Sequence, residues 1–543
     1  MLATEHLIIA PILIPLIAGA LMLLYDESQR KAKLGISIAS TIALLFVAIE
    51  LLNRSKGTPL SGGNEISFYL LGNWAVPFGI ILVLDRLSAL MLVLVAMLAI
   101  PTMVYAGANW HKQGQHFNSL FQFLLMGLNG AFLTGDLFNL FVFFEVLLAA
   151  SYGLLLHGSG QVKVRAGIHY IAMNLVGSLF FLVGVALIYG VTGTLSMAQL
   201  SQMVGNIAPS ERPLFHAGAA IMGVAFLIKA GLWPLSFWLP ITYMASAAPV
   251  AAIFSVMTKV GVYVILRLSM LIFGLGAGES AGFGADVLVW GGMATMLFGV
   301  FGVLGSQGLG RMAAHLVLIS SGTVLSAIGL ALMGGGTVLL SGALYYMVSS
   351  TLATTMLFLL IEPMTREQGG IAAMLALTAD AYGLDADEED EEEGGLAIPG
   401  TMTILGLCFG VCVIVLASLP PLSGFIGKVA MLSGMLGVGA LPGWVSWPFL
   451  AVLMLSGFAT LLGLVRIGIQ TFWASDSKPP KVLAMEFAPL ILLVSIIVAI
   501  TLRGDAVLRY TDATARALHD PLIYSVGVSE PRRSTVTQEE TGE

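Results

Sequence analysis

The stretch LFNLFVFFEVL, residues 137–147, combines a long apolar run with a single carboxylate, Glu145, near its middle. The run continues to about residue 157, and about 20 apolar residues are enough for a helix to cross a bilayer. A charge at the centre of such a helix costs roughly 2.5–3.5 kcal/mol by insertion scales, so it is rarely present without a function. The stretch therefore predicts a membrane-spanning helix with an ionisable group buried at mid-depth.

The composition of the whole chain agrees with this interpretation. Of 543 residues, 57% are hydrophobic and 10% are charged, whereas a soluble domain carries about 25% charged residues. This excludes a soluble enzyme, a nucleic-acid binder and a disordered scaffold. The net charge of −7 is local, because eight of the nine residues 385–393 are acidic. Two cysteines are too few for a disulfide framework or a metal cluster.

Apolar stretches of spanning length recur about fourteen times, which predicts an all-α polytopic membrane protein with one transmembrane body over residues 1–503. Residues 398–437 are too long for one straight helix, and we expect one broken span there. Lys and Arg in the short loops then place both termini outside. The acidic residues fall in a cytoplasmic loop, 362–397, which is either solvated and open or has a docking or cation-attracting role. The tail, 504–543, is too polar to span, and its first part is expected at the interface.

A short motif with proline occurs twice. Residues 233–237 read WPLSF and residues 421–425 read PLSGF, in the seventh and twelfth expected spans. Proline removes a backbone donor, so Pro234 and Pro421 predict broken helices. Because the two copies are five spans apart, an odd number, they cross the membrane in opposite directions. This indicates inverted repeats, a common transporter design, although five residues alone also allow coincidence.

Three lysines join Glu145 as ionisable residues inside expected spans: Lys229, Lys259 and Lys428. A buried lysine near a carboxylate gains or loses its proton when a neighbouring charge moves. The four residues therefore predict a proton relay, with structural ion pairs as the alternative. His315 is a weaker candidate near the cytoplasmic end of its span.

Two further acids are expected to be structural. Asp136 is interpreted as a helix N-cap or an interfacial acid, and Asp85 and Arg86 as a self-satisfying pair. The sequence has no P-loop, dinucleotide-binding turn, metal cluster or nucleophile elbow. We therefore expect no cofactor, no metal and no enzymatic activity, and the energy must come from an ion gradient or a partner.

The segments DLFNLFVFFE (136–145), KAGLWPL (229–235) and PLSGF (421–425) resemble the antiporter-like subunits of respiratory complex I, membrane-bound hydrogenases and Mrp-type (multiple resistance and pH) monovalent cation/proton antiporters. Over nearly the whole chain, the similarity is greatest to the D-type subunits of Mrp antiporters. The resemblance implies fourteen helices, inverted repeats at about 117–271 and 286–470, and broken helices seven and twelve. It also implies a proton path through Glu145, Lys229, Lys259 and Lys428. Ser349 stands where the family often has a histidine, so we expect water or His315 to take part in that link.

The resemblance implies the proton-translocating subunit of a multi-subunit Na⁺ or K⁺/proton antiporter in the bacterial inner membrane, acting in pH homeostasis with other Mrp-type membrane subunits. The alternative is a proton-pumping subunit of a complex I-like NADH dehydrogenase or a hydrogenase, and a structural scaffold is a third possibility. The sequence leaves open the coupling cation, the stoichiometry and whether the cation passes through this chain.

Overall fold

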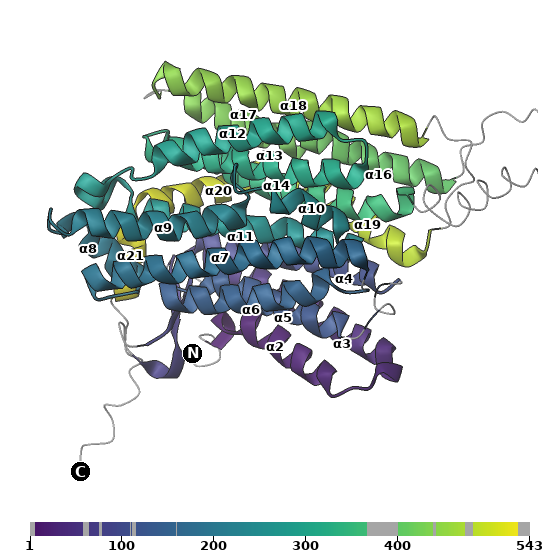
Figure 1. The fold of residues 1–543 in the computed structure, drawn as a ribbon, viewed down its shortest axis with the longest axis horizontal. Helices are drawn as coiled ribbons and strands as arrows, with labels where there is room; N and C mark the ends of the chain where they lie inside the picture. The colour runs from purple at the N-terminus through teal and green to yellow at the C-terminus, as the bar shows by residue number, and fades with distance from the viewer. Residues whose placement is uncertain are drawn as a thin grey trace, which may run out of the picture.

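The computed structural model describes residues 6–57, 65–74, 79–108, 116–158, 160–365, 400–437, 441–472 and 482–529, with Trp110 and Gly114. Helices run side by side along the long axis of the molecule (Figure 1). Within these residues, twelve helices are long and apolar enough to cross a membrane, and three shorter apolar helices accompany them. The predicted all-α polytopic fold is confirmed. The acidic run 385–393 lies outside the described residues.

The crossings follow one another in chain order. They are α2 (Ala10–Leu23), α3 (Arg30–Arg54), α4 (Arg86–Ala106), α5 (Phe117–Leu133), α6 (Leu137–Leu155), α7 (Gln161–Thr192), α9 (Arg212–Ala230) with α10 (Trp238–Ala245), α11 (Ala248–Ile272), α12 (Ala285–Gly305), α13 (Leu309–Leu332), α14 (Gly336–Thr365), α16 (Gly400–Ala417) with α17 (Ser423–Leu436), α18 (Gly443–Phe472) and α19 (Ala484–Leu502). Because α9–α10 and α16–α17 each make one crossing, the described residues contain the fourteen crossings expected.

Both broken helices are interrupted where proline was expected to interrupt them. Pro234 lies between α9 and α10, and Pro421 lies between α16 and α17. Side chains of neighbouring helices satisfy the backbone groups that the breaks set free. The backbone N–H of Trp233 donates to Thr295 Oγ1 at 2.8 Å, and that of Ser423 donates to Thr501 Oγ1 at 3.1 Å.

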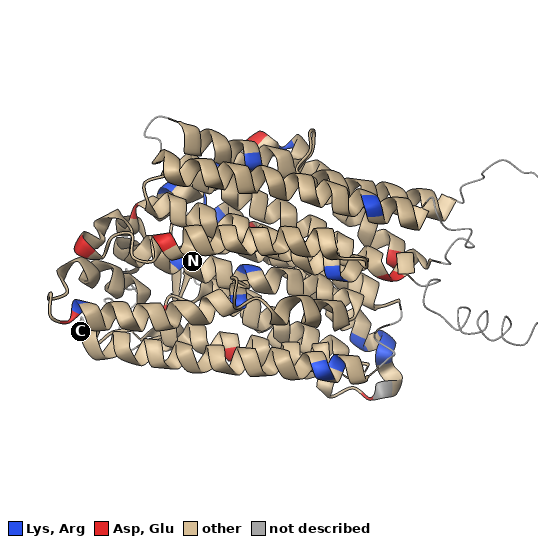
Figure 2. Ribbon diagram, turned by 45° about the horizontal axis from the view of Figure 1, so that its top comes forward, with Lys and Arg blue, Asp and Glu red and all other residues tan. Residues whose placement is uncertain are grey.

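The three most deeply buried crossings form the centre of the bundle. In α11, α13 and α14, 94% of the apolar window is buried, against 39% in α18 and 28% in α19. Charged residues are sparse along the helices and gather mainly toward their ends (Figure 2). These three helices hold several buried ionisable and hydroxyl groups, including Lys259 and Arg267 of α11 and Ser350 of α14.

Both described ends of the chain meet at one end of the bundle, at an antiparallel hairpin of β1 (Ser67–Leu70) and β2 (Ile81–Leu84). His6 Nδ1 lies 3.3 Å from the Tyr69 hydroxyl. The tail forms α20 (Gly504–His519) and α21 (Pro521–Ser529), and Thr511 hydrogen-bonds Ser341 of α14 at 2.9 Å. The first part of the tail thus packs against the protein, as the left side of Figure 1 shows.

Candidate functional site: buried lysines across the centre of the bundle

Glu145 lies on α6, partly buried, and accepts a hydrogen bond from the hydroxyl of Ser178 on α7. The helix that carries it starts as the sequence predicted. Asp136 is the N-cap residue of α6, and its Oδ1 accepts from the backbone N–H of Asn139 at 2.9 Å. Such a cap satisfies a backbone donor that the first turn leaves free.

Lys229 lies in the last turn of α9, immediately before the first break, and is 7% exposed. Its ammonium donates to Asn174 Oδ1 at 3.2 Å and lies 5.0 Å from the centroid of the Phe144 ring. An amide oxygen and an aromatic face both favour the charged form of a lysine. The Lys229 charge is thus compensated by polar neighbours.

Helix α7 connects Glu145 with Lys229. Asn174 and Ser178 are four residues apart, so they lie one above the other on the same face of α7. Among the described residues, no ion pair within 4.0 Å joins the two charges; each contacts α7 instead. The sequence analysis missed Asn174 and Ser178. The pattern that could have identified them is a pair of small polar residues four apart in an apolar span.

A small cavity continues from Lys229 toward α11. Its volume is about 20 Å³, enough for one water molecule. Lys229, Asn174, Tyr243 and Thr258 are among the residues that line it. Thr258 precedes Lys259 in the chain, so the cavity reaches the helix that carries Lys259.

Lys259 is the most deeply buried of the three lysines, at 1% exposure on α11. Its ammonium donates to the hydroxyls of Ser320 at 2.9 Å and Ser321 at 3.0 Å, both on α13. The Ser320 hydroxyl in turn lies 2.8 Å from that of Ser350 on α14. Three central helices are therefore joined by one hydrogen-bonded chain that starts at Lys259.

Lys428 lies on α17, beyond the second break, and is 4% exposed. Its ammonium lies 5.8 Å from the centroid of the Tyr346 ring of α14. Gly457 of α18 lies beside it, since a Cβ there would lie 3.4 Å from the Lys428 nitrogen, an ordinary contact distance. Tyr346 and Ser350 are four residues apart on α14, so Lys428 and the Lys259 chain approach the same face of that helix.

Ser349 and His315, the two residues considered for the link between the two expected repeats, lie in different surroundings. The Ser349 hydroxyl lies 2.6 Å from that of Ser423, the first residue of α17, so it faces the second broken helix. His315 Nδ1 lies 2.8 Å from its own helix carbonyl at Arg311, and its ring packs against Phe298 of α12. Within the described residues, His315 has no hydrogen bond to Lys259, Ser349 or Lys428.

The expected pair of Asp85 with Arg86 is wrong. Asp85 caps α4 and binds Arg267 of α11, whereas Arg86 binds Glu65 at 3.0 Å. Consecutive residues at a helix start point in different directions, so each finds its own partner. In the part of the chain that the structure describes, no group of three or more His, Cys, Asp or Glu residues could hold a metal ion.

Fourteen crossings, two broken helices and three buried lysines with amide, hydroxyl or aromatic neighbours define a class: multi-pass membrane proteins with the fold of ion-translocating subunits. Comparison with known proteins makes this more specific. Residues 134–455 match the family model described as NADH:quinone oxidoreductase/Mrp antiporter, TM. The chain belongs to this family, which confirms the resemblance inferred from the sequence.

The relatives match over nearly their full length. The chain is 51% identical to the D subunit of a probable K(+)/H(+) antiporter from Rhizobium meliloti (strain 1021), covering 97% of this chain and 98% of the relative. It is 32% identical to the D subunit of an Na(+)/H(+) antiporter from Alkalihalophilus pseudofirmus, covering 96% and 98%. The structure of the Mrp complex from Dietzia sp. DQ12-45-1b contains a similar chain, with a TM-score of 0.80, 27% identity and coverage of 98% and 100%.

Proposed function

We propose that this chain is the proton-translocating subunit of a multi-subunit monovalent cation/proton antiporter, working with other Mrp-type membrane subunits. The observation that carries the proposal is the series Glu145, Lys229, Lys259 and Lys428, each of which contacts polar or aromatic side chains of a neighbouring helix inside the bundle. Full-length similarity to antiporter D subunits favours this function over a redox-driven pump. The family description also covers NADH:quinone oxidoreductases, which keeps that pump as the second candidate.

The chemistry of the proposed path follows from its groups. An ammonium donates a proton and the neutral amine accepts one, and a hydroxyl does both. In this proposal, water in the cavity beside Lys229 carries the proton toward α11 and Lys259, and the hydroxyls of Ser320 and Ser350 extend the path from Lys259 to α14. Ser349 and Ser423 contact each other across the gap to the second broken helix, which carries Lys428.

Charge movement supplies the coupling in this proposal. Arrival of a proton at Glu145 removes a negative charge near Lys229 and so weakens its hold on its own proton. Placing an unpaired charge in a span costs roughly 2.5–3.5 kcal/mol. Protonation of Glu145 therefore lowers the proton affinity of Lys229 enough to affect transport.

The same proposal includes the arrangement in the membrane. We place both termini outside the inner membrane and the 362–397 loop in the cytoplasm, with inverted repeats over 117–271 and 286–470. Support comes from the two described ends meeting at one hairpin and from the opposite chain directions at the two breaks.

The direct test is ion flux through the purified complex in proteoliposomes with a trapped pH dye. We expect a pulse of Na⁺ or K⁺ to drive proton movement without any electron donor, and the comparison of the two salts identifies the coupling cation. Flux that depends on a redox substrate and ignores both cations would contradict the antiporter proposal.

A further inference from the structure

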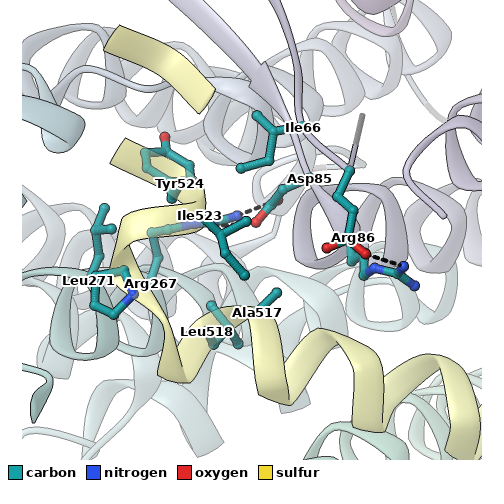
Figure 3. A pocket seen from close by; sticks show the side chains of 11 residues that line it. Ile66, Asp85, Arg86, Arg267, Leu271, Ala517, Leu518, Ile523 and Tyr524 are labelled. Carbon is teal, nitrogen blue, oxygen red and sulfur yellow. Dashed lines mark hydrogen bonds and ion pairs between the residues drawn. The ribbon is translucent and has the colours of Figure 1, made fainter. Parts of the chain in front are cut away.

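A buried ion pair lies at the end of the bundle that carries both described termini, away from the four relay residues. The Arg267 guanidinium binds both oxygens of Asp85, at 2.5 and 2.6 Å. Arg267 is 4% exposed. Figure 3 shows the pair between the start of α4 and the C-terminal helices.

The guanidinium is held on several sides. It donates to Ser88 Oγ at 3.1 Å and to the Tyr263 hydroxyl at 3.3 Å. It also lies 5.5 Å from the centroid of the Tyr263 ring and 5.2 Å from that of Tyr524 on α21. The guanidinium therefore contacts α4, its own helix α11 and α21, with Tyr263 one helical turn deeper in the bundle.

Arg267 lies two helical turns from Lys259 on α11, toward the end of the bundle that carries the termini. Lys259, Tyr263 and Arg267 follow one another at intervals of four residues, which places them on one side of α11 with a rise of about 6 Å per step. A cavity of about 20 Å³ adjoins the pair beyond Arg267, and Glu65, Asp85, Arg86, Pro521 and Tyr524 are among its lining residues. The column therefore leads from a relay lysine toward the end of the bundle.

An arginine in this position cannot carry the proton onward. A guanidinium stays protonated at all physiological pH values and has five donors and no acceptor. Its positive charge also repels an approaching hydronium, as arginines do in pores that exclude protons. Lys259, Tyr263 and Arg267 thus lie where a proton could leave toward the end of the bundle, but Arg267 cannot pass the proton on.

We propose that the Asp85–Arg267 pair is a proton barrier that isolates Lys259 from the aqueous phase at the end of the bundle bearing the termini. With the barrier in place, a proton on Lys259 leaves through Ser320 and Ser350 toward Lys428. Without it, the proton escapes along Tyr263 and the transmembrane pH gradient leaks. The inference rests on the proposed function, because it assumes that Lys259 carries protons.

A mechanical role is the competing explanation, since the pair also ties α4 to α11. Variants that remove the charge and variants that change only the shape of the contact distinguish the barrier role from the mechanical role. Asp85→Asn combined with Arg267→Gln removes both charges but keeps side chains that can hydrogen-bond. Arg267→Lys keeps the charge but loses the two-pronged contact. Tyr524→Ala removes the ring from α21 and leaves the guanidinium in place.

The experiment measures passive decay of an imposed pH gradient in proteoliposomes that hold the whole complex, in a medium free of Na⁺ and K⁺. The Asp85→Asn/Arg267→Gln variant should leak roughly tenfold faster or more, which corresponds to about 1.4 kcal/mol of lost barrier. Arg267→Lys and Tyr524→Ala should leak at the parent rate. The matched control is Arg212→Gln with Glu279→Gln, which neutralises another ion pair outside this column.

Two results would overturn the barrier. A leak at the parent rate in the neutralised variant shows that the charge is not needed. An equal leak in Arg267→Lys or Tyr524→Ala shows that shape, rather than charge, closes the column. If the double variant does not reach the membrane, Arg267→Gln alone tests the same charge, and a parent-level leak there is equally decisive. Cation-driven flux of the parent complex reports separately on the proposed function.

Discussion

At the scale of single residues, the ionisable members of the proposed path could be picked out from the sequence, and the side chains that contact them could not. An ammonium or carboxylate in an apolar span is rare enough to single out from the sequence. Serine and asparagine are common in such spans, and only packing shows which of them face a lysine. Ser320 and Asn174 were missed for this reason, and Asp85 was paired with Arg86 because proximity in the chain was taken for contact.

The two serines at Lys259 give a prediction at this scale. Replacing Ser320 and Ser321 with alanine removes both described hydrogen bonds of the ammonium, and each bond to a charged group contributes about 1.5–3 kcal/mol. The charged form of Lys259 is then less stable, and we expect cation-driven proton flux to fall about tenfold or more.

The control for this pair is Ser326→Ala on the same helix. The Ser326 hydroxyl donates to the Val289 carbonyl of α12 at 3.2 Å, away from Lys259. Flux measured with equal amounts of complex should be normal in this variant. The role given to the two serines is wrong if their double replacement transports as well as the control.

At the scale of elements, Pro234 and Pro421 predicted the breaks after α9 and α16, because proline removes a backbone donor. Proline alone does not decide a break, since Pro101 and Pro363 lie inside the continuous helices α4 and α14. The packing of α17 on α14 could not be predicted in this way. It depends on glycines: a Cβ at Gly427 would lie 2.9 Å from Tyr346 Cα, and one at Gly434 would lie 2.3 Å from the Leu339 nitrogen. Small residues allow such close contact between membrane helices.

Gly427→Val should therefore force α17 away from α14, with overpacking of this kind costing about 1–3 kcal/mol. We expect a lower thermal unfolding temperature of the detergent-solubilised complex and loss of flux, since Tyr346 is the residue beside Lys428. Gly410→Val is the matched control, because nothing lies within 4 Å of a Cβ at Gly410 on α16. Equal unfolding temperatures for the two variants would show that close α14–α17 packing is not required.

At the scale of the whole molecule, hydrophobic length predicted the number of crossings, because bilayer thickness sets how many apolar residues a crossing needs. It did not predict which crossings are central. The spans that became α11, α13 and α14 are no more apolar than α18 or α19, yet they are buried on all sides. The proposed path crosses these central helices laterally, so protons move along the membrane plane between the two broken helices.

The orientation proposed for the molecule predicts the behaviour of reporter fusions. Alkaline phosphatase fused after residue 543 should be active and green fluorescent protein at the same site dark, because that end is placed outside. The same reporters inserted within residues 366–399 should give the opposite pattern. Green fluorescence at the C-terminus together with an inactive phosphatase would reverse the orientation.

The central claim is that protons cross this chain on its buried lysines, and the most direct measurement is cation-driven proton flux with Lys229→Ala and Lys428→Ala in the reconstituted complex. Lys31→Ala, at an exposed lysine of α3, is the control. We predict that both buried variants assemble normally and lose antiport, while the control transports at the parent rate. Full antiport in both Lys229→Ala and Lys428→Ala would contradict the account.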